Sequence, residues 1–537
     1  MVHSQDKVER VLPYWLSNPR PLGQDLQNDS CSVMDMPWLD QALVGRLKQK
    51  GIHRFFPVQK AIIPEIWAQE AENESWVCPN DLCVSAMTGS GKTLAYVLPI
   101  LHCLKPLAKL PKKIRALVVL PTGPLALQSV KVFRDYSDCM GLKVGTAIGL
   151  ESLRQEQSEL VRRLEPWEQN MVKSGHYGVL GPPKPGSDPV THCVLVDIIV
   201  ATPDRLKDHV AHTPSFDLSH LRFVVFDEAD RLMSGDGGHW LNSIVNTIET
   251  QQQPNQKRFS TIFSPPEPKA MKLLFSATLS CNAETLQVIR LHNPVLYSTD
   301  LAYPNRHRGK QANGNYSARA KSTAAATTTH SVPSSLTEQY IVCELDLRPL
   351  LLHHLILTHH WKRVLVFTNR KETSHKLALT LQNLSADGYR VAEFSSKIGK
   401  LQANIIRKFH KGDIQVLVST DSLSRGMDFS EVSVVVNYDR TEKYTTYLHR
   451  IGRTARAGKP GLALSLIRLV QVHEFKKMVK QHSTHKVTEL TVDTKELHPY
   501  EELYKEALRL LKQNVIQEKR TSAKRLKKHV VGLKSKS

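Results

Sequence analysis

The sequence lacks the features of a secreted or membrane-bound protein. Its eight cysteines are scattered without a C-x-x-C pair, and even the nearest two, Cys78 and Cys83, are separated by four other residues. This spacing excludes a disulfide framework and a cysteine-based zinc site, and it fits a reducing compartment. The chain has no run of about 18 apolar residues, and its first residues lack the apolar segment of a signal peptide. We therefore expect a soluble, intracellular protein with no membrane partner.

Acidic residues are scarce relative to basic ones. There are 51 Asp and Glu residues against 72 Lys and Arg residues, which gives a formal net charge of +21. Such an excess indicates a polyanionic partner, although ribosomal, nuclear and nonspecifically cationic proteins share it. The apolar fraction of 41% is ordinary for a globular protein. A chain of 537 residues is too long for one hydrophobic core, so two or more domains are expected.

The segment 82–98, LCVSAMTGSGKTLAYVL, combines an apolar strand, a glycine-rich turn and the start of a helix. Glycines let backbone N–H groups approach an anion, and the helix dipole adds positive potential. Lys92 can reach the β- and γ-phosphates of a nucleotide, and the Thr93 hydroxyl can hold Mg²⁺. The pattern predicts a nucleoside triphosphate site, and a chance Gly/Ser turn between strand and helix is the alternative. The predicted loop comprises Ala86 (where glycine is usual), Met87, Thr88, Gly89, Ser90, Gly91, Lys92 and Thr93.

Four apolar runs in the first half of the chain each end in a short polar cluster. In a parallel sheet with crossover helices, these strand ends share one edge, where ligands bind. The third cluster begins with Asp227 and Glu228, which we expect to hold Mg²⁺ and to orient or deprotonate the attacking water. A pair of solvated caps is the alternative. The runs are 116–120, 194–201, 223–226 and 273–275, and the clusters that follow begin at Pro121, Thr202, Asp227 and Ser276.

Several segments around these strands differ in composition. Gln59 precedes the glycine-rich turn, and its amide can both donate to and accept from adenine. The first 30-odd residues are polar and are expected to be loosely attached. Two stretches, 164–189 and 251–268, are predicted surface insertions, and 303–335 is a basic, then Ala/Thr/Ser-rich linker.

A second alternating region covers residues 336–486. Its apolar runs 364–367, 416–418 and 434–436 also end in polar residues, but it has no glycine-rich loop. Arg450, Arg453 and Arg456 recur every three residues and would face one ligand if this stretch is helical. A solvated basic surface is the alternative. In a two-domain phosphate-loop protein we favour arginines delivered to the γ-phosphate.

The C-terminal part has two characters. Residues 500–512 predict an amphipathic helix, and the chain is strongly basic from Lys519 onward. We expect this tail to be mobile. RNA binding, nuclear localisation and simple solvation remain open as its role.

The motifs AMTGSGKT, ATPDRL, DEAD, SAT, STDSLSRGMD and HRIGRTARAG stand in the order found in DEAD-box RNA helicases, which the chain resembles over residues 38–482. The resemblance implies an α/β fold of two tandem RecA-like domains, each a mostly parallel sheet flanked by helices, that close on ATP, Mg²⁺ and single-stranded RNA. The implied segments are a lead-in (1–34), domain 1 (35–300), a linker (301–336), domain 2 (337–487) and a helix with a basic tail (488–537).

The resemblance also implies a process and a set of residue roles. FPVQ, LCVSA and DEADRLM look most similar to the nucleolar subgroup that acts in large ribosomal subunit maturation, which implies a monomer with pre-rRNA and protein partners. Asp428 would meet the ribose, and Arg453 and Arg456 the γ-phosphate. Asp230, Ser276, Thr278, His449 and Arg450 would couple hydrolysis to RNA. RNA phosphates would be met by Thr122, Gly149, Thr202, Arg205, Thr368, Asn369 and Thr420.

Four positions depart from the family pattern, and one of them is Pro57, which sits two positions later than the family proline. Gly123 and Gln402 stand where RNA-binding arginines are usual, and Met34 stands where an aromatic residue stacks on adenine, with Trp38 the nearest aromatic. We therefore weigh two functions: an RNA-stimulated ATPase that separates short duplexes or remodels ribonucleoproteins, and an ATP-gated RNA clamp with little unwinding of its own. Double-stranded DNA translocation is disfavoured, because accessory DNA-tracking elements are missing.

Overall fold

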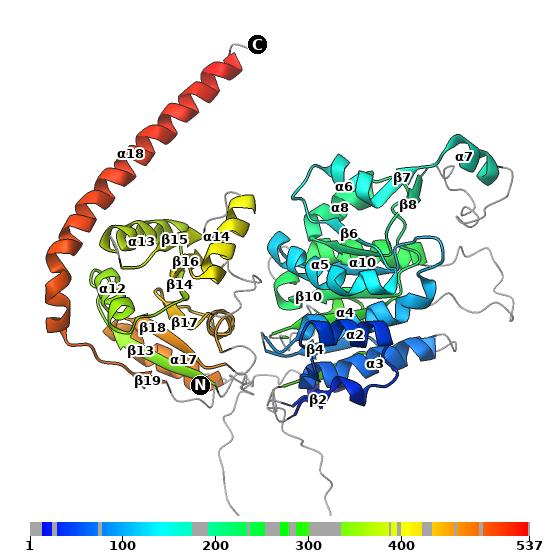
Figure 1. The fold of residues 1–537 in the computed structure, drawn as a ribbon, viewed down its shortest axis with the longest axis horizontal. Coiled ribbons are helices and arrows are strands. Elements are labelled where there is room, and N and C mark those ends of the chain that lie inside the picture. Colours follow the sequence, from blue (N-terminus) through cyan, green and yellow to red (C-terminus); the bar gives the residue numbers. More distant parts are fainter. Residues whose placement is uncertain are drawn as a thin grey trace, which may run out of the picture. The chain divides into compact units, whose positions relative to one another are not determined.

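The computed structural model describes residues 13–23, 29–73, 78–87, 89–173, 192–233, 237–252, 269–277, 279, 286–299, 335–385, 388–394, 399–421, 432–455, 459–482 and 487–534. They belong to two compact units, Met1–Ser331 and Val332–Ser537, and each unit contains a parallel sheet flanked by helices (Figure 1). This confirms the predicted α/β class. The predicted linker lies almost wholly outside the described residues, and the predicted segment boundaries remain predictions.

The first unit is organised on an eight-stranded sheet in the order β1-β12-β4-β11-β10-β5-β9-β6. Every pair in it is parallel. The inner strands are buried along nearly their whole length and are mostly apolar before their polar ends, as expected when helices cover both faces. The strands are β1 (Arg20–Pro21), β4 (Leu82–Ser85), β5 (Ala116–Val119), β6 (Val144–Ala147), β9 (Ile198–Ala201), β10 (Phe223–Asp227), β11 (Met271–Ser276) and β12 (Val295–Ser298).

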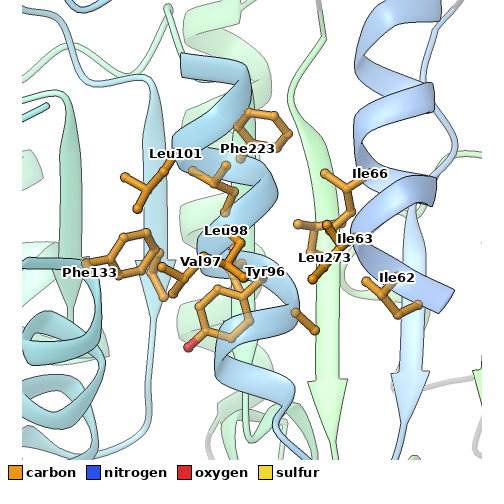
Figure 2. Close-up of a cluster of buried hydrophobic side chains, with 14 of the residues drawn as sticks. Ile62, Ile63, Ile66, Tyr96, Val97, Leu98, Leu101, Phe133, Phe223 and Leu273 are labelled. Carbon is orange, nitrogen blue, oxygen red and sulfur yellow. The ribbon is translucent and has the colours of Figure 1, made fainter. Parts of the chain in front are cut away.

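The sheet of the first unit separates two hydrophobic cores. Figure 2 shows the first core, where Tyr96, Val97, Leu98 and Leu101 lie between an isoleucine cluster and Phe133. The helix that begins at the glycine-rich turn is α4, and it is held in place because it packs against both α3 and α5. The helices are α2 (Gln41–Gln49), α3 (Pro57–Asn73), α4 (Lys92–Leu104), α5 (Gly123–Ser137), α6 (Leu153–Leu160), α7 (Pro166–Lys173), α8 (Pro203–His212), α9 (Ala229–Leu232) and α10 (Gly237–Gln252).

Two expectations for the first unit are wrong. The apolar run 194–201 is not one strand, because β8 (His192–Val194) pairs antiparallel with β7 (Val161–Arg163), and β9 begins only at Ile198. The described part of the lead-in, residues 13–23 and 29–34, is not loosely attached either. Residues 14–17 form the short helix α1, β1 extends the main sheet beside β12, and the side chains of Leu16 and Leu22 are 1% and 4% exposed. Hydrophobic burial and strand pairing therefore bind this segment to the unit.

The second unit has a seven-stranded parallel sheet in the order β15-β16-β14-β17-β18-β13-β19. The predicted strands that begin at residues 364, 416 and 434 are all present. The strands are β13 (Leu336–Val342), β14 (Val364–Thr368), β15 (Val391–Phe394), β16 (Val416–Thr420), β17 (Val434–Asn437), β18 (Gly461–Ile467) and β19 (Thr488–Glu489). The helices are α12 (Arg348–Thr358), α13 (Lys371–Leu384), α14 (Gly399–Lys411), α16 (Tyr444–Ile451) and α17 (Val472–His482).

The last helix is longer than expected. It was predicted over residues 500–512, but α18 runs from Glu501 to Lys534 and thus includes most of the basic tail (Figure 1). Its first half packs against α13. Among the described helices, none is both long enough and apolar enough to cross a membrane.

Candidate functional site

The phosphate loop and the acidic cluster lie at one edge of the first sheet. In the parallel register, Ser85 at the end of β4 lies opposite Ser276 of β11, and Asp227 at the end of β10 lies opposite Phe275. The Ala86 N–H donates to the Ser276 carbonyl oxygen at 3.0 Å. The predicted convergence of these strand ends is therefore confirmed.

The glycine-rich turn is shaped by left-handed backbone. Gly89 and Gly91 have φ values of +84° and +86°, a region that favours glycine, and Gly91 directly precedes α4. The buried ammonium of Lys92 donates to the carbonyl oxygens of Ala86 at 2.6 Å and Met87 at 3.0 Å. Ser90 Oγ also donates to the Met87 oxygen, at 2.8 Å. Lys92 is thus bound to carbonyl oxygens of its own loop. Of the predicted loop residues, Thr88 lies outside the described residues.

Gln59 braces the same turn. Its Oε1 accepts from the Phe56 N–H at 2.9 Å, and its Nε2 donates to the Gly91 carbonyl oxygen at 3.0 Å. A Cβ on Gly91 would lie 2.3 Å from Gln59 Nε2, so the close approach requires glycine. Because a primary amide has two donors and two acceptor lone pairs, one of each remains for a ligand.

The aromatic residue considered for adenine stacking is used elsewhere. Trp38 stacks on Trp67 with ring centroids 4.6 Å apart and planes 10° apart. Met34, at the family position of the stacking ring, is 62% exposed. The described structure therefore offers neither Trp38 nor an aromatic ring at position 34 for this contact.

Asp227 is a buried carboxylate with defined partners. Its Oδ1 accepts from the Glu228 N–H at 2.9 Å, and its Oδ2 accepts from the Tyr96 hydroxyl at 3.1 Å. Burial and, next, the charge of Glu228 raise the pKa of the Asp227 carboxyl to about 6, while Lys92 opposes this rise. Glu228 itself has φ +53°, an uncommon conformation for a non-glycine residue and one that occurs at functional sites.

Tyr96 is a site residue that the sequence reasoning missed. Its buried hydroxyl contacts Asp227 Oδ2, Ser129 Oγ at 3.1 Å and the Thr93 side chain. Helical spacing was the available signal, because Tyr96 follows Thr93 by three positions on α4 and must share its face. The hydroxyl thereby links the two residues predicted to hold Mg²⁺.

Of the three coupling residues predicted in the first unit, two are directly joined. Ser276 Oγ donates to Asp230 Oδ1 at 2.8 Å, which connects the acidic cluster after β10 to the end of β11. The third, Thr278, lies outside the described residues.

Three of the predicted RNA-contact residues of the first unit converge on the loop of residues 148–151. Thr202 Oγ1 donates to the Ile148 carbonyl oxygen at 3.2 Å, and Arg205 Nη2 donates to the Glu151 carbonyl oxygen at 2.5 Å. Gly149 is exposed within this loop. The remaining predicted contact, Thr122, precedes α5, and its buried Oγ1 has no hydrogen-bond partner among the described residues.

In the second unit, Arg450 organises the predicted RNA contacts. Its Nε and Nη2 donate to the two oxygens of Asp421 at 2.6 and 2.7 Å, and Nη2 also donates to Asn369 Oδ1 at 2.8 Å. Asp421 directly follows Thr420 at the end of β16, and Asn369 directly follows Thr368 at the end of β14. The guanidinium of Arg450 therefore joins the ends of these two strands. Arg450 is 1% exposed, which fits an organising role better than a direct ligand contact.

The condition for a shared helical face of the three arginines is not met over the described residues. Helix α16 ends at Ile451, so Arg450 is the one member of the cluster on it. Arg453 is buried beyond the helix end and donates from Nε to the His449 carbonyl oxygen at 3.3 Å. His449 is buried as well. Arg456 and Asp428 lie outside the described residues, and of Gln402 only the backbone, on α14, is described.

Two protein-family models match the chain. The DEAD/DEAH box helicase family matches residues 56–174 and 177–286, and the helicase conserved C-terminal domain matches residues 347–458. The first match includes the phosphate loop and the acidic cluster of the first unit, and the second match includes Arg450 and its partners in the second unit.

Similar curated proteins match nearly the whole chain. The human ATP-dependent RNA helicase DDX51 is 38% identical over 533 residues, which cover 96% of this chain and 74% of the relative. The probable ATP-dependent RNA helicase Dbp73D of Drosophila melanogaster is 34% identical, with 96% and 73% covered. The ATP-dependent RNA helicase dbp6 of Schizosaccharomyces pombe is 31% identical, with 88% and 74% covered.

Solved structures show the same fold. Mss116p bound to ssRNA and AMP-PNP superposes with a TM-score of 0.64 at 19% identity, covering 93% of this chain and 88% of Mss116p. Dbp5 of S. cerevisiae bound to RNA and ADP BeF3 gives a TM-score of 0.60 at 17% identity, covering 90% and 100%. The tandem RecA-like architecture is thus confirmed, and with relatives above 30% identity over most of their length, the chain belongs to the DEAD-box family of ATP-dependent RNA helicases.

Proposed function

We propose that this helicase hydrolyses ATP with Mg²⁺ at the glycine-rich loop, and that single-stranded or locally duplex RNA stimulates the reaction. The observation that carries the proposal is the placement of Asp227 and Glu228 at the same sheet edge as the loop of Lys92. A buried ammonium, left-handed glycines and two carboxylates at one edge match the needs of phosphoryl transfer.

The ATP contacts follow from the loop geometry. Lys92 now donates to two carbonyl oxygens of its own loop, and phosphate oxygens would take their place as acceptors. The first backbone N–H groups of α4, which begins at Lys92, have no acceptor within the helix and would donate to the phosphates. The remaining donor and acceptor of Gln59 would read the adenine edge.

The donor set around Asp227 fits Mg²⁺. Hydroxyl and carboxylate oxygens are the ligands this hard cation takes in proteins, and Thr93 and Asp227 supply them. A buried carboxyl with a pKa near 6 indicates that its negative charge is costly without a cation. The bound ion would neutralise charge on the phosphates. Glu228, held in its strained backbone conformation, would orient the attacking water and accept its proton.

The second unit would complete the ATP site. We assign Arg453 and Arg456 to the γ-phosphate and Asp428 to the ribose, by similarity to the family motifs. His449 and Arg450 would couple this chemistry to RNA, together with Asp230, Ser276 and Thr278. The Asp230–Ser276 hydrogen bond of 2.8 Å supports the part of this assignment that lies in the first unit.

RNA would be held through its backbone. Hydroxyls, an arginine and exposed backbone near strand ends suit phosphates and sugars, so little sequence preference is expected. Mss116p, which shares the fold, was solved with ssRNA and AMP-PNP, and Dbp5 with RNA and ADP BeF3. The net charge of +21 adds a long-range attraction for any RNA.

The cellular process is proposed from sequence similarity. The segments FPVQ, LCVSA and DEADRLM resemble nucleolar helicases of large ribosomal subunit maturation. We therefore propose pre-rRNA as substrate, protein cofactors of a pre-ribosomal particle as partners, and the nucleolus as location for a monomeric enzyme. The predicted segment boundaries at residues 34, 300, 336 and 487 form part of the same proposal.

Steady-state ATP hydrolysis with and without single-stranded RNA tests the mechanism. Lys92→Ala and Glu228→Gln should abolish turnover, and RNA should stimulate the native protein. Unchanged turnover in either variant would refute the assignment.

A second candidate is an ATP-gated RNA clamp with little unwinding of its own. Gly123, with no side chain, starts α5 where the family has an RNA-binding arginine, and this favours a weaker or partner-dependent function. Robust strand separation by the isolated chain would exclude the clamp.

A further inference from the structure

A buried carboxylate outside the ATP site lies beneath the predicted RNA contacts of the first unit. Glu156 is in α6 and is 3% exposed. Burying an ionised carboxylate is costly unless hydrogen bonds and opposite charges compensate it, so its partners show what it is for.

Glu156 has four partners, two on each oxygen. Oε1 accepts from the backbone N–H groups of Ile148 at 3.1 Å and Gly149 at 2.8 Å. Oε2 lies 2.9 Å from Arg205 Nε and 3.1 Å from His209 Nε2. One carboxylate therefore joins the 148–151 loop to α8, the helix that carries Arg205.

His209 completes the arrangement as a neutral donor. It is fully buried, and burial lowers the pKa of its imidazole despite the hydrogen bond to Glu156. Its other nitrogen, Nδ1, lies 2.8 Å from Thr213 Oγ1. A neutral ring with Nε2 protonated donates to Glu156 and accepts from Thr213, so the negative charge of Glu156 stays available to Arg205.

The loop and the arginine also fit each other sterically. Gly149 has φ +81°, and a Cβ there would lie 3.4 Å from Arg205 Nε. Arg205 Nη2 donates to the Glu151 carbonyl oxygen at 2.5 Å. The guanidinium is thus tied at Nε and Nη2, and Nη1 lies 3.4 Å from Asp208 Oδ2, while the Arg205 side chain keeps 16% exposure.

We propose that Glu156 is a positioning residue that orients Arg205 and fixes the 148–151 loop for RNA binding; this rests on the proposed RNA role of Arg205 and Gly149. A free arginine side chain loses much rotational freedom when it binds, and holding it in place beforehand removes that cost. This matters more here because Gly123 supplies no arginine of its own.

A double-mutant cycle with Glu156→Gln and Arg205→Ala tests the proposal. The glutamine can still accept from the two N–H groups, but its NH₂ group would face the Arg205 Nε–H. We expect the RNA concentration for half-maximal ATPase stimulation to rise about fivefold to tenfold, the scale of one ordinary hydrogen bond. ATP hydrolysis without RNA should stay unchanged. In the Arg205→Ala background, Glu156→Gln should add little.

Two further variants keep the outcomes distinct. Glu159→Gln, exposed and one turn along α6, is the matched control and should change nothing. Arg205→Lys keeps the charge without the Nε contact and leaves the buried carboxylate in place, so it should bind RNA as weakly as Arg205→Ala. This variant tests the proposal even if Glu156→Gln fails to fold.

Each opposing result has its own meaning. Native RNA affinity in Arg205→Ala would refute the proposed RNA role of Arg205. If Arg205→Ala binds RNA weakly but Arg205→Lys binds it as the native protein does, the positioning role of Glu156 is overturned and the RNA role of Arg205 stands. The same holds if Glu156→Gln causes its full loss of RNA affinity in the Arg205→Ala background as well.

Discussion

The hydroxyl of Tyr96 donates a 3.1 Å hydrogen bond to the carboxylate of Asp227, across 131 positions of sequence. The same hydroxyl contacts Ser129 and Thr93. A tyrosine on α4 thereby holds the proposed Mg²⁺ ligands in register with each other, and this relationship leads to the first prediction.

Tyr96→Phe removes the hydroxyl and keeps the ring in its core. We expect the Mg²⁺ concentration for half-maximal ATPase activity to rise severalfold, because Asp227 loses a partner that orients it. The free energy of unfolding should fall by about 1 kcal/mol, the usual value of one hydrogen bond. Mg²⁺ titration of the ATPase and urea unfolding measure the two effects.

A matched control separates orientation from stability. Tyr389 in the second unit also has a buried hydroxyl, 2.8 Å from His353 Nδ1. Tyr389→Phe should cost similar stability and leave the Mg²⁺ requirement unchanged. An equal shift of the Mg²⁺ requirement in both variants would argue against a specific role for Tyr96.

Gly123→Arg should strengthen RNA binding. A Cβ at this position would lie 3.3 Å from Ile148 Cγ2 and 4.0 Å from Leu150 Cδ2, so only a small shift is needed. One added phosphate contact should steepen the salt dependence of RNA affinity by roughly 0.7 log units per log unit of salt. Salt titrations of RNA binding measure this, with Gly123→Gln as a neutral control of similar length. A slope that stays the same would place RNA away from the start of α5.

The sequence predicted the strands well where burial on both faces leaves a continuous apolar run. It failed over 194–201, where Asp197 interrupts the run and is fully buried against Arg115 at 2.6 Å and Lys112 at 2.7 Å. Those partners lie more than 80 positions away, so a local pattern cannot show them. β1 has two residues, too few for any periodicity.

The site was predictable to a similar extent. The phosphate loop and the acidic pair follow from local chemistry, and the parallel sheet brings them together. The contacts of Arg450 with Asp421 and Asn369 join positions 29 and 81 residues apart, and an arginine spacing of three does not reveal that α16 ends at Ile451. Tertiary contacts decide these features, and spacing alone does not encode them.

Arg450→Lys should destabilise the second unit. Lysine cannot make the paired bonds to Asp421 and also reach Asn369, so the Asp421 carboxylate, directly after β16, keeps at most one hydrogen bond from this position. Losing one charge-assisted hydrogen bond costs about 2 kcal/mol. Urea unfolding of the full chain measures the loss. Arg407→Lys, at an exposed position on α14, is the control. Native stability in Arg450→Lys would show that Asp421 needs only a nearby positive charge and not the paired hydrogen bonds of an arginine.

The attachment of α18 should depend on pH. His375 of α13 lies between Glu393, 2.7 Å from Nδ1, and Glu518 of α18, 2.9 Å from Nε2. Burial lowers the pKa of His375, but the hydrogen bonds to the two carboxylates outweigh it, and the net shift is upward. A histidine whose folded pKa exceeds its unfolded value stabilises the fold fully below about pH 6.5. This contribution is lost as the pH rises through the folded pKa.

His375→Gln should therefore lower the urea midpoint at pH 6 and have little effect at pH 9. His473→Gln, an exposed histidine on α17, should change neither value. A His375→Gln effect that is the same at both pH values would indicate packing in place of an imidazolium bridge.

Removal of residues 1–23 should destabilise the first unit. Leu16 and Leu22 are buried, β1 pairs with β12, and Arg20 Nη1 donates to the Tyr297 hydroxyl at 2.7 Å. Two buried leucines contribute on the order of 3 kcal/mol together, after allowance for a compact unfolded state. Thermal unfolding should show a melting temperature several degrees lower. In the full chain, the pair Leu16→Ala and Leu22→Ala should reproduce most of this loss, whereas Tyr14→Ala, at an 82% exposed position, should not. An unchanged melting temperature after truncation would mean that the lead-in adds no stability, and strand β1 would then be a consequence of the fold and not one of its supports.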